Sequence, residues 1–161
     1  MVKPAVSAGS LDTARHTDPA RAREHVAALL ATGRTVMVQP YLPAVDTWGE
    51  TALLYLDGRF SHAIRKGPLL SDGAATEGGL YLEEEIEPRV PSVRERQLGD
   101  AVIALATERL GRLLYARVDV LADPSGAPVL LELELAEPSL LLAHGLGASA
   151  RLAAGMAAEI C

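Results

Sequence analysis

Four charged residues in the second half of the chain have types and spacing suited to phosphate chemistry. Arg117 and Asp119 are separated by one residue, and so are Glu132 and Glu134. Because strand side chains alternate between faces, each pair would project from one side of its strand. Carboxylate oxygens are ligands that Mg²⁺ prefers, and a guanidinium group binds phosphate. The pattern predicts a metal site on Asp119, Glu132 and Glu134, with Arg117 beside it.

The two pairs meet only in one register of the hairpin whose turn is expected at residues 123–126. A turn centred between Ser125 and Gly126 would place Asp119 opposite Glu132, with Arg117 and Glu134 on the same face. A three-residue turn with a bulge at Gly126 would put the two acids on opposite faces. The sequence leaves both registers open, and we take the first. Paired Cβ atoms would then lie about 5 Å apart, and two carboxylates that close repel each other unless a cation lies between them. The alternative is a solvated strand face with an Arg–Glu pair.

A second hairpin is expected over residues 51–66. Asp57-Gly58 suits the two positive-φ positions of a type I′ turn. This turn predicts that Glu50 faces Arg65, while Lys66 projects to the other face. One of the two cations could contact phosphate, and the alternative is a surface ion pair that contributes less than about 1 kcal/mol.

Two further segments could contact a nucleotide. Lys3 precedes a loop of small residues whose backbone N–H groups could cover phosphate, although an exposed lysine and an ordinary turn would look the same. A proline ends the strand expected at residues 35–39, where free backbone groups could meet an adenine edge. A proline-terminated edge strand is the alternative. The residues concerned are Lys3, Ser7, Gly9, Ser10, Gln39, Pro40, Tyr41 and Leu42.

The remaining elements follow from caps and periodicity. Asp18-Pro19 begins a helix that ends at Gly33. Ser92 and Glu95 have capping-box spacing, so a helix should follow and end at Gly111. Its apolar face is expected to comprise Leu98, Ala101, Val102 and Leu105.

Strands are expected at residues 2–6 and 35–39, the second of them buried. Residues 67–91 read as a long loop with at most one short strand, near residues 80–82. A last helix is expected at residues 148–160. No apolar stretch is long enough to span a bilayer.

Composition narrows the classes of function. The net charge of −6 argues against a nucleic-acid partner. The only cysteine is Cys161, and no signal peptide begins the chain, so a cytoplasmic protein is expected. The four histidines are scattered without metal-ligand spacing.

Together these motifs resemble ATP-grasp enzymes over nearly the whole chain. The strand at Lys3 and its loop resemble the family's nucleotide lysine and phosphate-covering loop, and residues 39–42 resemble its adenine hinge. Asp46 stands where a ribose-binding acid is usual, and Lys66 or Arg65 where a cation contacts phosphate. Arg117, Asp119, Glu132 and Glu134 resemble the family's Mg²⁺ and phosphate set, in which the last ligand is often Asn rather than Glu.

The resemblance implies an α+β ATP-grasp fold, with antiparallel sheets and flanking helices. Residues 1–42 would be the remainder of the small lobe and residues 43–161 the large lobe, with nucleotide between them. The family's N-terminal region is not matched, which suggests a fragment with an open sheet edge and a possible homodimer. Residues 49–68 and 137–139 resemble a branch with O-ureido-serine cyclo-ligases and glutathione-synthetase-like ligases.

The resemblance also implies an activity. With ATP and Mg²⁺ or Mn²⁺ as cofactors, a small carboxylate substrate would be converted to an acyl phosphate, which an amine or related nucleophile would capture. The rival expectations are a non-catalytic module that binds nucleotide or a partner, and a kinase-like transfer of phosphate without ligation.

Overall fold

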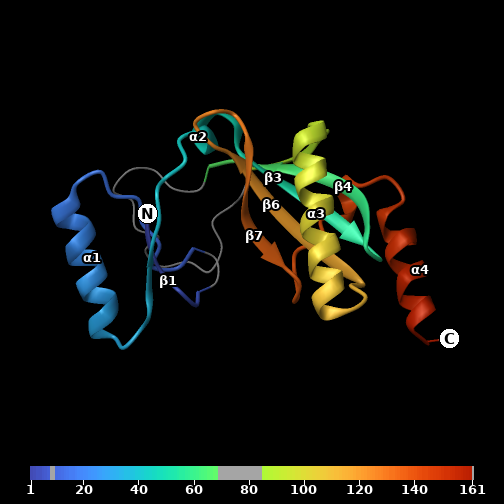
Figure 1. The fold of residues 1–161 in the computed structure, drawn as a ribbon, viewed down its shortest axis with the longest axis horizontal. Coiled ribbons are helices and arrows are strands. Elements are labelled where there is room, and N and C mark those ends of the chain that lie inside the picture. Colours follow the sequence, from blue (N-terminus) through green and yellow to red (C-terminus); the bar gives the residue numbers. More distant parts are fainter. Residues whose placement is uncertain (8–9, 69–84, 161) are drawn as a thin grey trace. The chain divides into compact units, whose positions relative to one another are not determined.

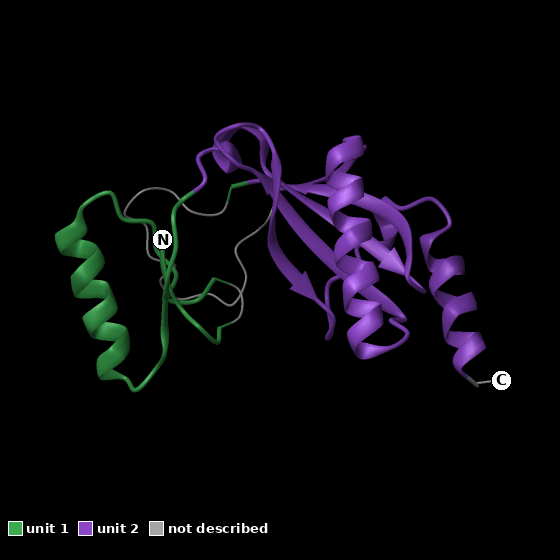
Figure 2. Cartoon of the chain, in the orientation of Figure 1, with its two compact units in different colours: residues 1–41, 68–84 green, residues 42–67, 85–161 purple. Residues whose placement is uncertain are grey.

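The structure is a computed structural model, which describes residues 1–7, 10–68 and 85–160. The chain divides into two compact units, the first comprising Met1–Tyr41 with Pro68–Glu84 and the second comprising Leu42–Gly67 with Glu85–Cys161 (Figure 2). Among the described helices, none combines the length and the apolar character that a bilayer span requires.

The first unit is a small α/β arrangement (Figure 1). Strand β1 (Val2–Pro4) pairs antiparallel with β2 (Val36–Val38), and helix α1 (Pro19–Ala31) contacts both strands. The predicted helix start is confirmed, because the Asp18 side chain accepts a hydrogen bond of 2.8 Å from the backbone N–H of Ala20.

The expectation of a buried strand at residues 35–39 is wrong in its burial. Met37 is 43% exposed and Val38 is 68% exposed. A sheet of two strands has a single covered face and an open edge, so a run of apolar residues on it cannot be buried on both sides. The apolar run is typical of a strand, but it does not indicate how many strands pair in the sheet.

The second unit contains a five-stranded antiparallel sheet in the order β5-β4-β3-β6-β7. Its strands are β3 (Glu50–Leu56), β4 (Arg59–Lys66), β5 (Ile86–Arg89), β6 (Tyr115–Ala122) and β7 (Pro128–Glu134). Both predicted hairpins are confirmed as β3–β4 and β6–β7. Between residues 67 and 91 the expected loop contains strand β5, which was not predicted, and residues 80–82 lie outside the described residues.

Helix α3 (Val93–Leu110) covers one face of this sheet (Figure 1). The predicted capping box is present, with the Ser92 hydroxyl accepting from the backbone N–H of Glu95 and the Glu95 carboxylate accepting from that of Ser92. Gly111 ends the helix at a φ of 86°. These local signals fixed both ends of α3 correctly.

The predicted apolar face of α3 is partly wrong. Leu105 is 51% exposed and Ala101 is exposed, whereas Gly99, Ile103 and Ala106 are buried. A glycine at position 99 lets the helix approach the sheet closely, because a Cβ there would lie 2.5 Å from atoms of Leu53 and Tyr55. The face that α3 buries against the sheet therefore comprises Gly99, Ile103 and Ala106 rather than Ala101 and Leu105.

Three helical segments complete the unit. Helix α4 (Ala148–Ile160) begins where predicted and contacts β3 and β4, whereas the short helices α2 (Ala44–Trp48) and η1 (Leu142–His144) were not predicted.

The sheet has two different faces. Leu53, Val118 and Val120 point toward α3 and form the larger core with Ile103. Residues that alternate with them, such as Ala52, Leu54 and Ile64, form a second core on the other face. That second face also carries Asp119, so the sheet itself separates the main hydrophobic core from the charged residues.

Candidate metal centre

The β6–β7 hairpin brings the predicted charged residues together on the sheet face opposite α3. Asp119 lies opposite Glu132, and Arg117 lies opposite Glu134. One carboxylate oxygen from each of Asp119, Glu132 and Glu134 lies within 4.8 Å of the other two. The pairing that the sequence favoured is therefore present.

The turn, however, does not produce this pairing in the expected way. Near the turn, Ala122 pairs with Pro128, and Gly126 has a φ of 81°, which matches the three-residue alternative. Leu131 then inserts as a bulge between the residues opposite Asp119 and Val120, and the bulge shifts the register by one. The register shift at Leu131 thus reverses the shift that the three-residue turn introduces, and the acids lie on one face of the hairpin.

The β3–β4 hairpin also contains a bulge, and it overturns the predicted facing of Glu50 and Arg65. The type I′ turn pairs Leu56 with Arg59 as expected, but the register shifts beyond Tyr55 because Ser61 is an extra residue. Glu50 therefore lies opposite Lys66, and both share the face of Asp119.

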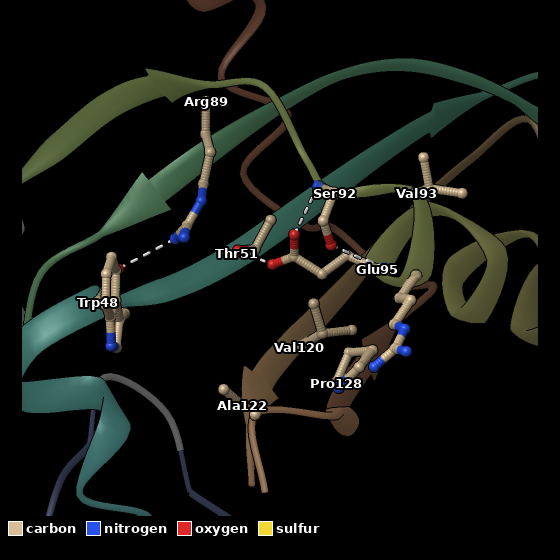
Figure 3. Close-up of a pocket in the computed structure, with 12 residues that line it drawn as sticks. Trp48, Thr51, Arg89, Ser92, Val93, Glu95, Val120, Ala122 and Pro128 are labelled. Carbon is tan, nitrogen blue, oxygen red and sulfur yellow. Dashed lines mark hydrogen bonds between the residues drawn. The ribbon is translucent and has the colours of Figure 1, made fainter.

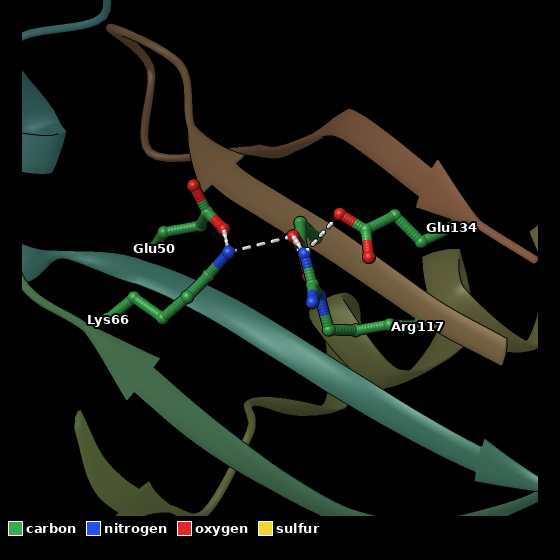
Figure 4. A network of polar contacts seen from close by, with 5 residues as sticks. Glu50, Lys66, Arg117 and Glu134 are labelled. Carbon is green, nitrogen blue, oxygen red and sulfur yellow. Dashed lines mark hydrogen bonds and ion pairs between the residues drawn. The ribbon is translucent and has the colours of Figure 1, made fainter. Parts of the chain in front are cut away.

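Lys66 and Arg117 tie the carboxylates into one network (Figure 4). Lys66 Nζ donates to Asp119 Oδ2 at 2.8 Å and also contacts a carboxylate oxygen of Glu50. Arg117 Nε lies 2.9 Å from Asp119 Oδ1, and Arg117 Nη2 lies 2.9 Å from Asp119 Oδ2 and 2.6 Å from Glu134 Oε1. Two cations are thus held among acids from three strands.

The electrostatics of the network differ from one acid to the next. Burial alone would raise the pKa of Asp119, but Lys66 and Arg117 outweigh it and hold that pKa below its usual value. Burial, followed by the charge of Asp119, raises the pKa of Glu50 to about 7. Burial and the nearby Glu132 raise the pKa of Glu134 against the opposing effect of Arg117. Among the described residues the site contains four acids and two cations, Lys66 and Arg117, so its net charge is negative when all four acids are ionised.

This donor set fits a divalent cation. The three acids supply oxygen ligands from the β6–β7 hairpin. Mg²⁺ is bound through one or two carboxylates while keeping other positions for water and phosphate. Asp119 is 0% exposed, which disagrees with the alternative of a solvated strand face. Glu132 is exposed, so the set opens to solvent on one side.

Lys66 and Arg65 occupy different environments. Arg65 lies opposite Thr51 on the face that α3 covers, donates to the backbone carbonyl of Trp48 at 3.1 Å and pairs with Glu85 at 3.4 Å. Of the two candidate cations, it is Lys66 that the structure brings to the carboxylates.

The other predicted nucleotide contacts lie mainly in the first unit. Lys3 pairs with Met37 across β1 and β2, and the Ser7 hydroxyl donates to the Leu11 carbonyl at 2.9 Å. Ser10 has a φ of 59°. Gly9 lies outside the described residues.

The hinge residues show local contacts of their own. The backbone carbonyl of Gln39 accepts a hydrogen bond of 2.9 Å from the N-terminal amine, and the Tyr41 ring lies 3.9 Å from the Arg15 guanidinium carbon. Pro40 is exposed. Leu42 begins the second unit, and Asp46 lies in the first turn of α2.

Glu50 is the member of the network that the sequence reasoning did not assign to the site. A regular hairpin would place it opposite Arg65, whereas the bulge places it opposite Lys66. The pair Ser61-His62 carried no turn or glycine signal for the bulge, so only the three-dimensional pairing reveals the role of Glu50.

A separate pocket of about 610 Å³ lies on the α3 side of the sheet (Figure 3). Val120, Val93 and Trp48 contribute apolar surface, while Glu95 accepts from the Thr51 hydroxyl at 2.6 Å. It lies on the opposite face from the carboxylates, so it is not part of the candidate metal centre.

Comparisons with known proteins agree with the fold. No family model matches the chain. The cycloserine biosynthesis protein DcsG of Streptomyces lavendulae is 36% identical over 168 residues, which include 99% of this chain and 54% of DcsG. The crystal structure of the D-cycloserine synthetase DcsG matches with a TM-score of 0.86 and 34% identity, over 99% of this chain and 55% of that one.

More distant structures share the fold alone. The D-alanine–D-alanine ligase of Bacillus anthracis complexed with ATP matches with a TM-score of 0.56 at 17% identity, over 87% of this chain and 46% of the ligase. The ATP-grasp ligase PsnB, complexed with a precursor peptide and AMPPNP, matches at 0.50 and 18% identity, over 87% and 39%. The chain spans about half the length of the curated relative that it matches. By sequence and by fold this chain therefore resembles about half of DcsG, and it shares its fold with part of the ATP-grasp ligase PsnB.

Proposed function

We propose that this chain is the metal- and nucleotide-binding part of an ATP- and Mg²⁺-dependent ligase that joins a carboxylate to an amine or a related nucleophile. The observation that carries the proposal is the convergence of Asp119, Glu132 and Glu134 with two cations on one sheet face. The 36% identity to DcsG supports the same class of reaction.

In this proposal, Asp119, Glu132 and Glu134 hold the divalent cation. When bound, the cation supplies positive charge to phosphate oxygens. Arg117 keeps the Glu134 carboxylate in place and offers further donors toward phosphate, and Lys66 offers an ammonium group from the neighbouring hairpin.

The remaining nucleotide contacts are proposed from the resemblance. The first unit would be the remainder of the small lobe, with Lys3 and the loop at Ser7, Gly9 and Ser10 near phosphate. Gln39, Pro40, Tyr41 and Leu42 would contact adenine, and Asp46 would contact ribose. Lys66 shares the sheet face of the three acids, whereas Arg65 lies on the face that α3 covers, so we assign the phosphate contact to Lys66.

The proposed chemistry has two steps. A substrate carboxylate oxygen attacks the γ-phosphorus of ATP, the bond to the bridging oxygen breaks, and ADP leaves with the bonding electrons. The nucleophile then attacks the acyl carbon of the acyl phosphate, phosphate leaves, and the nucleophile loses a proton. Positive charge from Lys66 and Arg117 would favour both steps, because negative charge accumulates on the transferred oxygens.

A second candidate is a nucleotide-binding module that turns nothing over. The coverage of 54% of DcsG supports this candidate, because the rest of DcsG lies outside the match. Nucleotide binding is common to both candidates, so it is the first property to test.

The test is calorimetric titration of the chain with ATP, in Mg²⁺ and in a chelator. The proposal predicts binding that needs Mg²⁺ and that weakens at least about tenfold in Glu132→Ala. Glu87→Gln, which neutralises an exposed acid on β5 of the same sheet, is the matched control and should bind as the wild type does. Equal affinity in chelator, or in Glu132→Ala, would contradict the proposed site.

Phosphate release then separates ligation from the rival kinase-like reaction. Ligation predicts sustained release of inorganic phosphate only when a carboxylate and a nucleophile are both present. A phosphorylated acid that accumulates without any need for a nucleophile would favour the kinase-like reaction. Binding without turnover of any acid would favour the second candidate.

A further inference from the structure

Lys66 is shared between two carboxylates that have different surroundings. Its Nζ lies 2.8 Å from Asp119 Oδ2 and also contacts Glu50. The Lys66 side chain is 11% exposed and the Glu50 side chain 15%, whereas Asp119 is completely buried. One ammonium group thus joins an acid of the metal set to an acid outside it (Figure 4).

Asp119 Oδ2 is crowded with donors. It accepts from Lys66 Nζ, from Arg117 Nε at 3.0 Å and from Arg117 Nη2 at 2.9 Å. Arg117 Nε is shared with Oδ1, from which it lies 2.9 Å, so Lys66 Nζ and Arg117 Nη2 are the donors that Oδ2 does not share. A divalent cation bound to Asp119 would be close to both positive groups and would repel them.

Lys66 is the group that can move. Arg117 is held by Glu134 at 2.6 Å as well as by Asp119, and both of those acids belong to the proposed metal set. Lys66, by contrast, already contacts Glu50, an acid directly opposite it in the β3–β4 ladder. Lys66 would therefore keep an acceptor outside the metal set if it left Asp119, whereas both acid partners of Arg117 belong to that set.

We propose that Glu50 is a positioning residue, which takes the ammonium group of Lys66 away from Asp119 when a divalent cation binds. Before the cation binds, Lys66 supplies positive charge beside Asp119. On cation binding, the Lys66–Asp119 contact opens while the Lys66–Glu50 contact persists. The inference rests on the proposed metal site and adds a residue to it.

The chain offers a direct reporter, because Lys3 and Lys66 are its only lysines. In a ¹⁵N-lysine-labelled sample, the Nζ signal of Lys66 should shift on titration with Mg²⁺ alone and should not shift in Glu132→Ala. In the Mg²⁺-bound wild type the Nζ protons stay protected from water by Glu50. In Mg²⁺-bound Glu50→Gln they should exchange faster, because the displaced ammonium has lost its second acceptor.

Affinities for Mg²⁺ provide a second readout. Glu50→Gln should weaken Mg²⁺ binding on the order of tenfold. A nearby charge of opposite sign changes a proton-binding equilibrium by at least about this factor, and a similar effect is expected for the cation. Lys66→Met should tighten it. Glu87→Gln and Arg59→Met are matched controls, since each makes the same charge change at an exposed position on the sheet, and both should leave the affinity nearly unchanged.

The double variant Glu50→Gln/Lys66→Met distinguishes a role of Glu50 that acts through Lys66 from a direct effect of the Glu50 charge on the cation. If Glu50 acts through Lys66, Glu50→Gln should have little effect in the Lys66→Met background. The same weakening in both backgrounds would mean that Glu50 is only a nearby charge, and that result would overturn the inference.

The lysine signals keep the inference testable even if Lys66→Met does not fold. Mg²⁺ binding that needs Glu132 while the Lys66 signal stays unmoved would overturn the role of Glu50 and leave the proposed function standing. No Mg²⁺ binding by the folded chain would overturn the proposed metal site, and the inference with it.

Discussion

Lys66 Nζ lies 2.8 Å from Asp119 Oδ2, although the two residues are 53 positions apart in the chain. The contact exists because the bulge at Ser61 brings Lys66 opposite Glu50, and because β3 pairs with β6 so that Ala52 lies opposite Asp119. The buried ion pair therefore depends on an irregularity of the β3–β4 hairpin rather than on any local motif. Its energetic and functional roles can be tested separately.

Replacing Lys66 with methionine should lower the free energy of unfolding by about 3 kcal/mol, measured by urea denaturation in chelator. The loss is expected because Asp119, at 0% exposure, would lose a cation and stay buried. Arg59→Met, at an exposed position on the same strand, controls for the change of charge and should cost less than about 0.5 kcal/mol. Equal stability of Lys66→Met and wild type would show that the contact is absent in solution.

Gly99→Ala should destabilise the chain by about 1–3 kcal/mol, even though alanine is the better helix former. A Cβ at this position would lie 2.5 Å from Leu53 Cδ1 and from Tyr55 Oη, so α3 would have to move away from the sheet. Thermal unfolding of this variant should be compared with that of Gln97→Ala, an exposed position on the same helix. An increase in stability for Gly99→Ala would mean that α3 packs differently.

Stability should fall with decreasing pH partly because of His62. Burial, together with the nearby positive charge of Arg151, lowers the pKa of His62 despite the Leu140 carbonyl that accepts from its ring. A lowered folded-state pKa means that the unfolded chain binds more protons. The contribution of His62 is therefore complete above about pH 6.5 and is lost as the pH falls below that value.

The corresponding measurement is urea denaturation of wild type and His62→Gln between about pH 7.5 and about pH 5. The wild type should lose more stability over this range than the variant does. Parallel curves would show that His62 titrates alike in the folded and unfolded chains.

Local signals predicted much of the fold. The Asp18 cap, the Ser92–Glu95 capping box and the Asp57-Gly58 turn each act over a few residues, and each is present as expected. The features of the fold that were predicted wrongly depend on contacts between residues far apart in the chain. The exposure of Val38 depends on how many strands pair beside it, and the buried face of α3 includes the close contact of Gly99 with the sheet.

The candidate site also depends on features that the sequence did not indicate, namely the bulges in its two hairpins. Alternation along β6 and β7 correctly grouped Asp119 with Glu132, but the reason given, a regular turn, was wrong. On β4 the assumption of regularity chose the wrong partner for Glu50. A bulge inverts the faces of a strand at the cost of one residue, and neither bulge here contains a glycine or proline that would mark it.

The proposed cation site on Asp119, Glu132 and Glu134 can be located by anomalous diffraction from crystals grown with Mn²⁺ and a non-hydrolysable ATP analogue. An anomalous peak is expected among the carboxylate oxygens of these three residues, next to the analogue's phosphates. A nucleotide-bound crystal in which every Mn²⁺ peak lies away from Asp119 and Glu132 would contradict the proposed site.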